Sequence, residues 1–258
     1  MSNVEGQIIW HELVVADVDA ALSFYPPITG WSATKRVVGG AEQAIFEVQS
    51  KSIATVVNLS LRAGVPAGAA GWISYALTGD VDKATEKATA LGGLVILAAM
   101  TTTDVGRFAI IEDPLGASIG LFAPARVEGD STWQSDQRTG QVGWRELYTT
   151  DVDAALDFYS EMFGWKRDQA FEMGPAGTYQ TVSVGGQPIG GMMRRPEVVP
   201  QNLWSPFIQV ADIEDAERRV REHNGSIVDG LRPVPGGNWT VKCTDNQGRM
   251  FALSGRKR

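Results

Sequence analysis

The sequence is poor in the side chains that most often bind metals or form covalent cross-links. It has one cysteine, Cys243, and two histidines, His11 and His223, among 258 residues. An intrachain disulfide and a thiolate metal cluster are therefore excluded. Cys243 lies in the predicted strand WTVKCTD with no adjacent histidine. This setting is more typical of a buried small side chain than of a nucleophile.

An excess of positive charge and a long apolar run are also missing. The chain has 23 basic and 30 acidic residues, for a net charge of −7. A nucleic-acid partner is not expected, because phosphate binding needs a concentrated positive face. No apolar stretch approaches the length of a membrane span, and the first residues do not resemble a signal peptide. We therefore expect a cytoplasmic protein with neither a nucleic-acid nor a membrane partner. A homodimer remains an open arrangement.

What the sequence does have is an internal repeat. Shifted by about 134 positions, the segment from Trp10 to Trp31 matches the segment from Trp144 to Trp165 at 13 of 22 positions. Chance gives about one or two matches, so the chain contains a duplication. The position after the first tryptophan differs, with histidine in one copy and arginine in the other.

Hydrophobic periodicity predicts a strand, a helix and further strands, twice in each half. An aspartate suited to N-capping precedes each opening helix. Because prolines lack the amide hydrogen, Pro26 and Pro27 should end the first helix near Tyr25 and make the two halves differ there. A second helix is expected over 81–91. Strands are expected over 44–48, 53–59, 72–78, 108–112 and 118–122. The polar stretch 125–140 is interpreted as a linker between domains 1–124 and 141–258.

These motifs, with D-V-D-A-A-x-x-F-Y in both halves and D-P-L-G-A-x-I-x-L-F ending the first, resemble the vicinal oxygen chelate superfamily. That superfamily includes glyoxalase I, bleomycin-resistance proteins and extradiol dioxygenases. The chain is most similar to its tandem two-domain, hydroxylase-like branch. The resemblance implies an α+β fold of two tandem domains. Each would contain two βαβββ modules that form an open eight-stranded barrel around a cleft.

The resemblance also implies where a divalent metal would be bound. The first ligand positions correspond to Trp10 and Trp144, the second to Ile73 and Ser205, and the third to Gly120 and Ala252. Indole, glycine and alanine offer no lone pair to a cation, and a catalytic site needs about three donors. We therefore expect no metal and no cofactor. An alternative is that a shifted register brings His11 into the cleft beside Glu12.

Strand alternation should turn Glu12 and Glu146 toward the clefts, beside the two tryptophans. A carboxylate there is either a general base or ligand acceptor, or a structural group satisfied by a neighbouring arginine, tyrosine or amide. Both carboxylates are thus candidate catalytic residues. The candidate ligand-binding residues are Trp10, Tyr75, Phe108, Trp144, Tyr148, Tyr179, Met192, Phe207 and Trp239.

Three functions remain open from the sequence. The first is a metal-independent protein that binds a small hydrophobic or aromatic molecule in a cleft, as bleomycin-resistance proteins do. The second is a metal-independent lyase, isomerase or hydroxylase-like enzyme that uses Glu12 or Glu146 as acid or base. The third is a divalent-metal glyoxalase or dioxygenase. Of the two clefts, the second is the preferred site.

Overall fold

The computed structural model describes residues 4–38, 41–62, 65, 70–125 and 138–258. The first half contains β1 (Ile8–Val15), α1 (Val18–Thr29), β2 (Ser32–Val38), β3 (Ala41–Val48), β4 (Lys51–Asn58), the short helix η1 (Leu59–Leu61), β5 (Trp72–Leu77), α2 (Val81–Ala90), β6 (Leu94–Thr102), β7 (Gly106–Glu112) and β8 (Ser118–Pro124). Most of the predicted linker, residues 126–137, lies outside the described residues.

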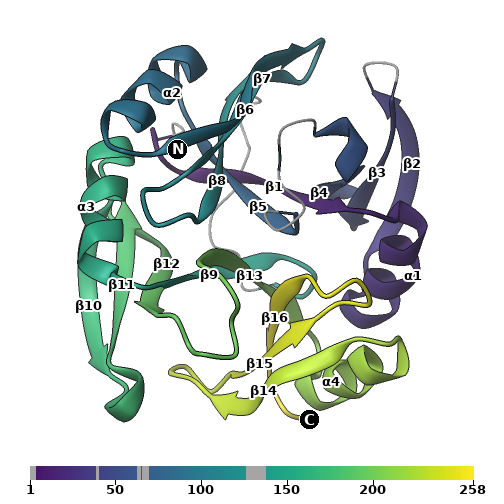
Figure 1. The fold of residues 1–258 in the computed structure, drawn as a ribbon. Coiled ribbons are helices and arrows are strands. Elements are labelled where there is room, and N and C mark those ends of the chain that lie inside the picture. The colour runs from purple at the N-terminus through teal and green to yellow at the C-terminus, as the bar shows by residue number, and fades with distance from the viewer. Residues whose placement is uncertain (1–3, 39–40, 63–64, 66–69, 126–137) are drawn as a thin grey trace.

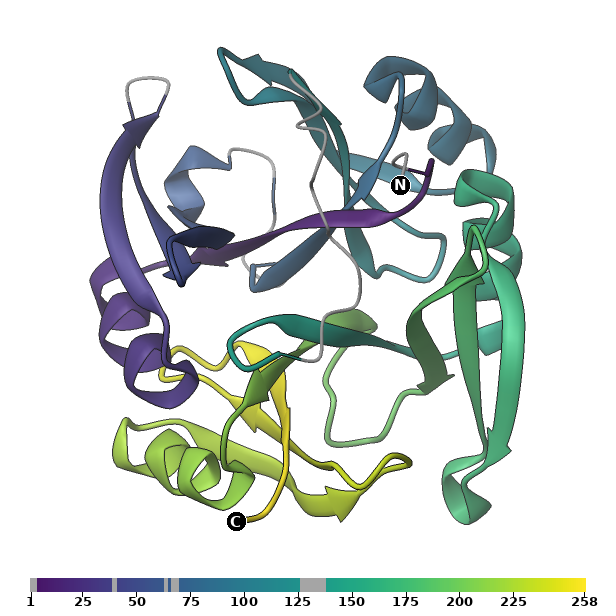
Figure 2. The same ribbon diagram turned by 180° about the vertical axis from the view of Figure 1, so that it is seen from behind.

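The second half repeats this order. It contains β9 (Val142–Thr149), α3 (Val152–Phe163), β10 (Lys166–Glu172), η3 (Gly174–Ala176), β11 (Thr178–Val184), β12 (Gln187–Arg194), β13 (Leu203–Val210), α4 (Ile213–Glu222), β14 (Ser226–Pro233), β15 (Trp239–Thr244) and β16 (Met250–Gly255). The two halves lie against each other in Figures 1 and 2.

Each half forms one eight-stranded mixed sheet. The strand orders are β2-β3-β4-β1-β5-β8-β7-β6 and β10-β11-β12-β9-β13-β16-β15-β14. The central strands β1 and β5 pair antiparallel, while β1–β4 and β5–β8 pair parallel. The edge strands do not pair with each other in the described part of the chain, so neither sheet closes. The predicted α+β fold with two open, tandem eight-stranded units is confirmed.

Each long helix begins at an aspartate, as predicted for the opening helices α1 and α3. The side chains of Asp17, Asp80, Asp151 and Asp212 each accept a hydrogen bond from a backbone amide in the first helical turn. None of the described helices is long and apolar enough to cross a lipid bilayer.

The predicted end of the first helix at Tyr25 is wrong. Helix α1 continues through Pro26 and Pro27 to Thr29, and Gly30 caps it with a φ of 77°. The Thr29 hydroxyl donates to the carbonyl oxygen of Tyr25 at 2.8 Å, and the Gly30 amide donates to that of Pro26 at 3.0 Å. Burial of the last turn in the core outweighs the two amide hydrogen bonds that the prolines cannot make.

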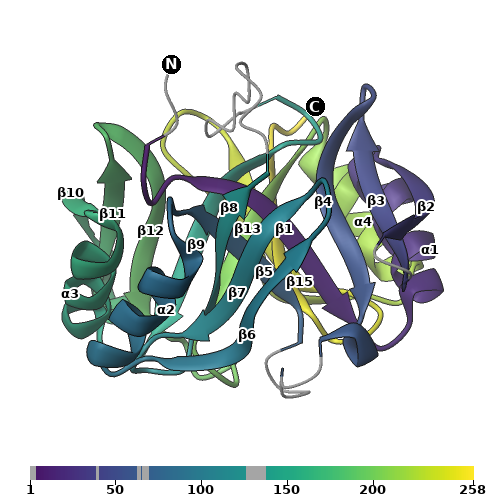
Figure 3. The same cartoon turned by 90° about the horizontal axis from the view of Figure 1, so that it is seen from above.

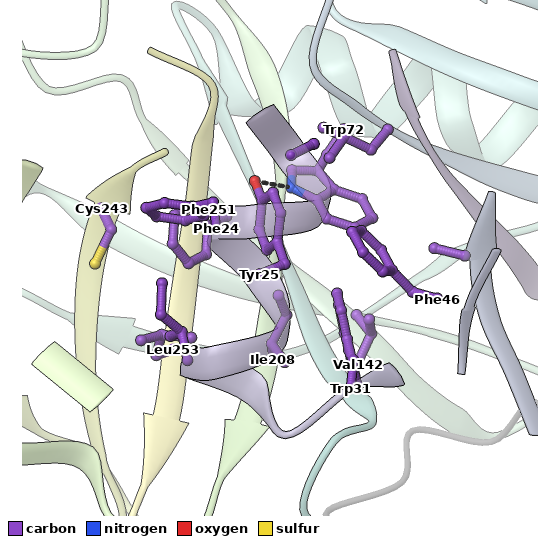
Figure 4. Packing of buried hydrophobic residues seen from close by; sticks show 14 of the residues in the cluster. Phe24, Tyr25, Trp31, Phe46, Trp72, Val142, Ile208, Cys243, Phe251 and Leu253 are labelled. Carbon is purple, nitrogen blue, oxygen red and sulfur yellow. Dashed lines mark hydrogen bonds between the residues drawn. The ribbon is translucent and has the colours of Figure 1, made fainter. Parts of the chain in front are cut away.

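The two halves share their hydrophobic cores. Each core therefore contains helices and strands from both halves. Side chains of α1, β1 and β3 pack with those of α4, β13, β15 and β16 in one cluster. Figure 4 shows Phe24 and Tyr25 of α1 beside Phe251 and Leu253 of β16. A second cluster joins α2, β7 and β8 to α3, β9 and β12. Figure 3 shows the same pairing, with α1 near α4 and α2 near α3.

The repeated aromatic residues form this contact between the halves. The hydroxyl of Tyr25 donates to Asp245 at 3.0 Å and accepts from the Trp72 indole at 2.9 Å. Tyr159 repeats the arrangement with Asp113 and Trp204 at 3.0 and 2.8 Å. The indoles of the two repeated tryptophans also cross between the halves. Trp31 donates to the carbonyl oxygen of Gly140 and Trp165 to that of Gly6.

The histidine and arginine at the non-matching position meet each other between the halves. The guanidinium of Arg145 donates to Nε2 of His11 at 3.2 Å, and the Ser74 hydroxyl lies 3.1 Å from Nδ1. Equivalent residues that meet must lie on the pseudo-twofold axis relating the halves. If both halves had arginine at this position, two positive charges would be in contact. One arginine and one neutral histidine form a donor–acceptor pair instead.

Burial and the charge of Arg145 lower the pKa of His11 well below its usual 6.5. Below about pH 6.5 the imidazole of His11 takes up a proton in the unfolded chain but stays neutral in the folded chain. The free energy of unfolding therefore falls as the pH drops below about 6.5. We predict that His11→Gln, which keeps an acceptor and a donor, reduces the stability difference between pH 7.5 and 5.5 by about 1 kcal/mol. Urea unfolding at the two pH values measures this. His223→Gln is the control, and an unchanged pH dependence in His11→Gln would contradict the assignment.

Candidate functional site

Each sheet has an outer face toward the shared cores and an inner face away from them. On β1, His11, Leu13 and Val15 point outward, so Trp10 and Glu12 point inward. His11 therefore does not enter the inner face beside Glu12, despite a register irregularity between Ile8 and Trp10. The two inner faces, one in each half, are the candidate sites.

The inner face of the first sheet is closed by a buried ion pair. The guanidinium of Arg62, which follows η1, donates to both carboxylate oxygens of Glu12, at 2.8 and 2.5 Å. The Tyr75 hydroxyl adds a third bond to Glu12 at 3.1 Å. Both charged side chains are only 6% exposed. Glu12 therefore corresponds to the structural alternative, a carboxylate satisfied by an arginine and a tyrosine.

Arg62 is held in its charged form. Burial lowers its pKa, but hydrogen bonds to Glu12 and the charge of that carboxylate outweigh burial and raise the pKa above the usual arginine value. Its guanidinium also lies 5.3 Å from the centre of the Phe108 ring. The internal repeat did not indicate Arg62 as a partner of Glu12, because Arg62 lies outside the segments 10–31 and 144–165 in which the two halves match clearly.

The residues at the three metal-ligand positions of the first half do not fit a cation. The Trp10 indole donates to the Thr55 hydroxyl at 3.0 Å, and Ile73 is apolar. A Cβ atom at Gly120 would lie 2.1 Å from the Tyr75 ring, which therefore fills the space of the third ligand. Among the described residues, no group of three or more His, Cys, Asp or Glu side chains is placed to hold a metal.

The inner face of the second sheet has a different polar cluster. The Tyr148 hydroxyl donates to Glu146 Oε2 at 2.7 Å, and Nζ of Lys242 lies 3.2 Å from the same oxygen. The Trp144 indole donates to the Tyr179 hydroxyl at 2.7 Å. Burial and the nearby Glu146 charge raise the pKa of Tyr148 and of Tyr179, so both phenols stay protonated donors.

Tyr179 reaches this cluster because Gly191 has no side chain. A Cβ atom on Gly191 would lie 2.2 Å from the Tyr179 hydroxyl oxygen. Gly191 pairs with Glu146, just as Thr55 pairs with Glu12. The tyrosine hydroxyl thus replaces the threonine hydroxyl that binds the tryptophan in the first half.

Lys242 is a charged residue of this face that the sequence did not indicate. It pairs with Ala252 on β16, whereas Ile110 pairs with Gly120 in the first half. Its ammonium lies 4.7 Å from the centre of the Tyr148 ring. The side chains of Lys242 and Glu146 are 18% and 11% exposed. This ion pair is therefore more accessible to solvent than the pair in the first half.

The metal-ligand positions of the second half do not supply a donor set either. Trp144 is bonded to Tyr179, Ala252 has no donor, and Ser205 is a single neutral hydroxyl. Ser205 lies directly opposite Glu146 on the neighbouring strand. Its Oγ is buried and has no hydrogen-bond partner within the described residues. These residues fit a ligand hydroxyl better than a divalent cation.

Seven of the nine candidate ligand-binding residues lie on an inner face, and two do not. Met192 pairs with Leu147 and is buried in the core shared with the first half, while its neighbour Met193 points inward. Trp239 shares the outward direction of Val241 and packs against the other shared core. Both corrections follow from strand alternation, because adjacent residues cannot both point inward. The inward residues are Trp10, Tyr75, Phe108, Trp144, Tyr148, Tyr179 and Phe207.

Comparisons with known proteins agree with this architecture. The profile of the Glyoxalase/Bleomycin resistance protein/Dioxygenase superfamily matches residues 7–121 and 141–253. "Putative glyoxylase CFP32" of Mycobacterium tuberculosis is 27% identical over 252 residues, covering 96% of this chain and 94% of its own. The anthracycline biosynthesis protein DnrV of Streptomyces peucetius is 29% identical over 268 residues, covering 96% and 92%.

Solved structures share the fold. The 2,3-dioxygenase LapB from Pseudomonas sp. KL28 superposes with a TM-score of 0.64 at 13% identity, covering 100% of this chain and 94% of its own. The Mn(II)-bound glyoxalase from Novosphingobium aromaticivorans gives 0.62 at 16% identity, covering 100% and 84%. At these identities the similarity concerns the fold alone.

The two ion pairs should differ in their contribution to stability. Glu12→Gln leaves the buried guanidinium of Arg62 without its anionic partner, and we predict a loss of about 3–5 kcal/mol in the free energy of unfolding. Glu146→Gln should cost only about 1 kcal/mol, because the partly exposed Lys242 can turn toward water. Urea unfolding of both variants at pH 7.5 measures the difference. Equal losses would show that the two inner faces are equally closed.

Proposed function

This chain belongs to the Glyoxalase/Bleomycin resistance protein/Dioxygenase superfamily, and from that premise we propose that it binds a small aromatic molecule on the inner face of its second half. The observation that carries this proposal is the difference between the two inner faces. The first is filled by the buried Arg62–Glu12 pair, with both side chains 6% exposed. The second presents Glu146 and Lys242, which remain partly accessible. One ligand per chain is therefore expected.

An aromatic ligand suits the side chains around this pair. Trp144 and Tyr179 are half-buried, and Phe207 pairs with Trp144 on the neighbouring strand. Indole and phenol rings give large rigid surfaces for a flat ligand, and each has a polar atom that fixes orientation. Met193 adds a flexible apolar side chain next to Lys242. Apolar walls with a few converging polar groups are typical of small-molecule sites.

The names of the relatives support an aromatic ligand more than a glyoxalase reaction. Two Streptomyces relatives are named anthracycline biosynthesis proteins, and anthracyclines are polycyclic aromatic compounds. The name of the mycobacterial relative suggests glyoxalase activity for that protein. In this chain the positions that would bind the metal of a glyoxalase are occupied by groups without suitable donors. A metal-independent role therefore agrees better with the residues present.

A second candidate function is acid–base catalysis on the bound molecule. It is favoured by one arrangement, the convergence of the Tyr148 hydroxyl and the Lys242 ammonium on one oxygen of Glu146. A carboxylate within hydrogen-bond distance of a ligand proton can act as a general base. Glu146→Gln distinguishes the two functions by turnover: glutamine keeps an acceptor oxygen for a ligand hydroxyl, so the ligand still binds in both cases, but an enzyme loses the base and with it the turnover of the bound molecule.

The proposed site can be tested by equilibrium dialysis with 1-naphthol as the probe. We predict one bound 1-naphthol per chain, and a rise in Kd of about fivefold in Trp144→Ala, since aromatic contacts contribute about 0.5–1.5 kcal/mol. Trp10→Ala, at the equivalent position of the first half, is the matched control and should leave Kd unchanged. Circular dichroism confirms that both variants are folded. Two bound probes per chain, or an equal loss in both variants, would contradict the proposal.

A further inference from the structure

Ser205 carries a hydroxyl group that the folded chain itself does not use. The residue is 1% exposed on the central strand β13, and its Oγ has no hydrogen-bond partner within the described residues. A buried hydroxyl without a partner lowers stability, so such a group in a native protein needs an explanation, and a bound molecule is one. The hydroxyl lies on the inner face, because Ser205 is directly opposite Glu146 in the antiparallel pair of β9 and β13.

The duplication shows that the fold does not need a hydroxyl at this position. The residue opposite Glu12 in the first half is Ile73, which packs in the apolar cluster of that inner face. An apolar side chain therefore satisfies the same backbone position equally well. In the second half serine leaves both an unpaired polar atom and a smaller side chain beside the carboxylate. Both differences favour a bound group next to Glu146.

The neighbouring groups restrict the chemistry of that bound group. Glu146 is a carboxylate that accepts from Tyr148 and Lys242 through Oε2. A ligand carboxylate at Ser205 would face the negative charge of Glu146, and a ligand carbonyl has no proton to donate to it. A hydroxyl can accept from the Ser205 Oγ–H and donate to a Glu146 oxygen at the same time. Trp144 and Phe207, which lie on the same face, favour a hydroxyl that is carried by a flat apolar ring.

We propose that Ser205 and Glu146 together bind a phenolic hydroxyl of the ligand, so that the second half selects phenols over other aromatic molecules. This inference rests on the proposed function and specifies the ligand class of the same site. Ser205 would contribute as a specificity residue through its hydroxyl. Lys242 would hold the Glu146 carboxylate in place through its contact with Oε2.

The experiment compares four naphthalene probes by equilibrium dialysis: 1-naphthol, naphthalene, 1-naphthaldehyde and 1-naphthoate. The wild-type protein should bind 1-naphthol at least fivefold more tightly than the other three. In Ser205→Ala the Kd for 1-naphthol should rise about fivefold, the usual effect of one hydrogen bond, while the Kd for naphthalene stays the same. Ser74→Ala is the control, because Ser74 is equally buried but contacts His11 between the halves.

A second readout separates a ligand contact from a structural role. Because Ser205→Ala removes an unpaired buried hydroxyl, it should raise the urea midpoint of the ligand-free protein or leave it unchanged, whereas Ser74→Ala should lower it. If Ser205→Ala weakens all four probes equally, or leaves 1-naphthol binding unchanged, phenol selection by Ser205 is wrong while binding at the site stands. If the wild-type protein binds none of the probes, the proposed function fails and this inference fails with it.

Discussion

The packing of the two halves against each other is the constraint on which the rest of the structure depends. The outer face of each sheet is apolar, and the helices of both halves are needed to cover it. Burying these faces requires the repeated residues to stay nearly the same. Tyr25 and Tyr159 each donate across the contact to a buried aspartate, and Trp31 and Trp165 each donate to a backbone carbonyl of the other half. Each of these contacts stabilises one of the two shared cores, so both copies of the repeated residues are needed.

The inner faces are free of this constraint, and there the copies have diverged. In the first half a guanidinium satisfies the carboxylate of the opening strand. In the second half Lys242 from β15 and Tyr148 from β9, the strand that carries Glu146, take that role. The first arrangement is fully buried and makes the inner face part of the scaffold. The second leaves a charged pair less deeply buried, and beside it lies the Ser205 hydroxyl, for which the described residues provide no hydrogen-bond partner. Duplication thus permits one half to remain structural while the other is free to change, as the proposed ligand site in the second half would require.

The repeat and the alternation of apolar residues predicted the order of strands and helices, because both record burial directly, and the resemblance to the superfamily supplied the arrangement of the strands in open sheets. Residues that follow the alternation of the opening strand, such as Trp144 and Glu146, were placed on the correct face. Met192 and Trp239 were not, because aromatic or methionine identity suggested a ligand contact and the direction of each side chain was left out. The edge strands β2 and β10 gave no clear signal, because their side chains are almost entirely exposed and show no alternation.

The sequence by itself determined the duplication, the repeated strand–helix pattern and the aspartate caps of the two opening helices, since each depends on residue type at a fixed spacing. The open eight-stranded sheets and the metal-ligand positions came from the resemblance to the superfamily, and the residues at those positions then showed that they do not suit a cation. Only the tertiary structure decided which carboxylate pairs with a buried arginine and which with a less deeply buried lysine. Arg62 and Lys242 reach Glu12 and Glu146 from segments distant in the sequence, and no local pattern records that meeting. It also decided that His11 and Arg145 face each other, because contact across a pseudo-twofold axis exists only once both halves have folded and packed.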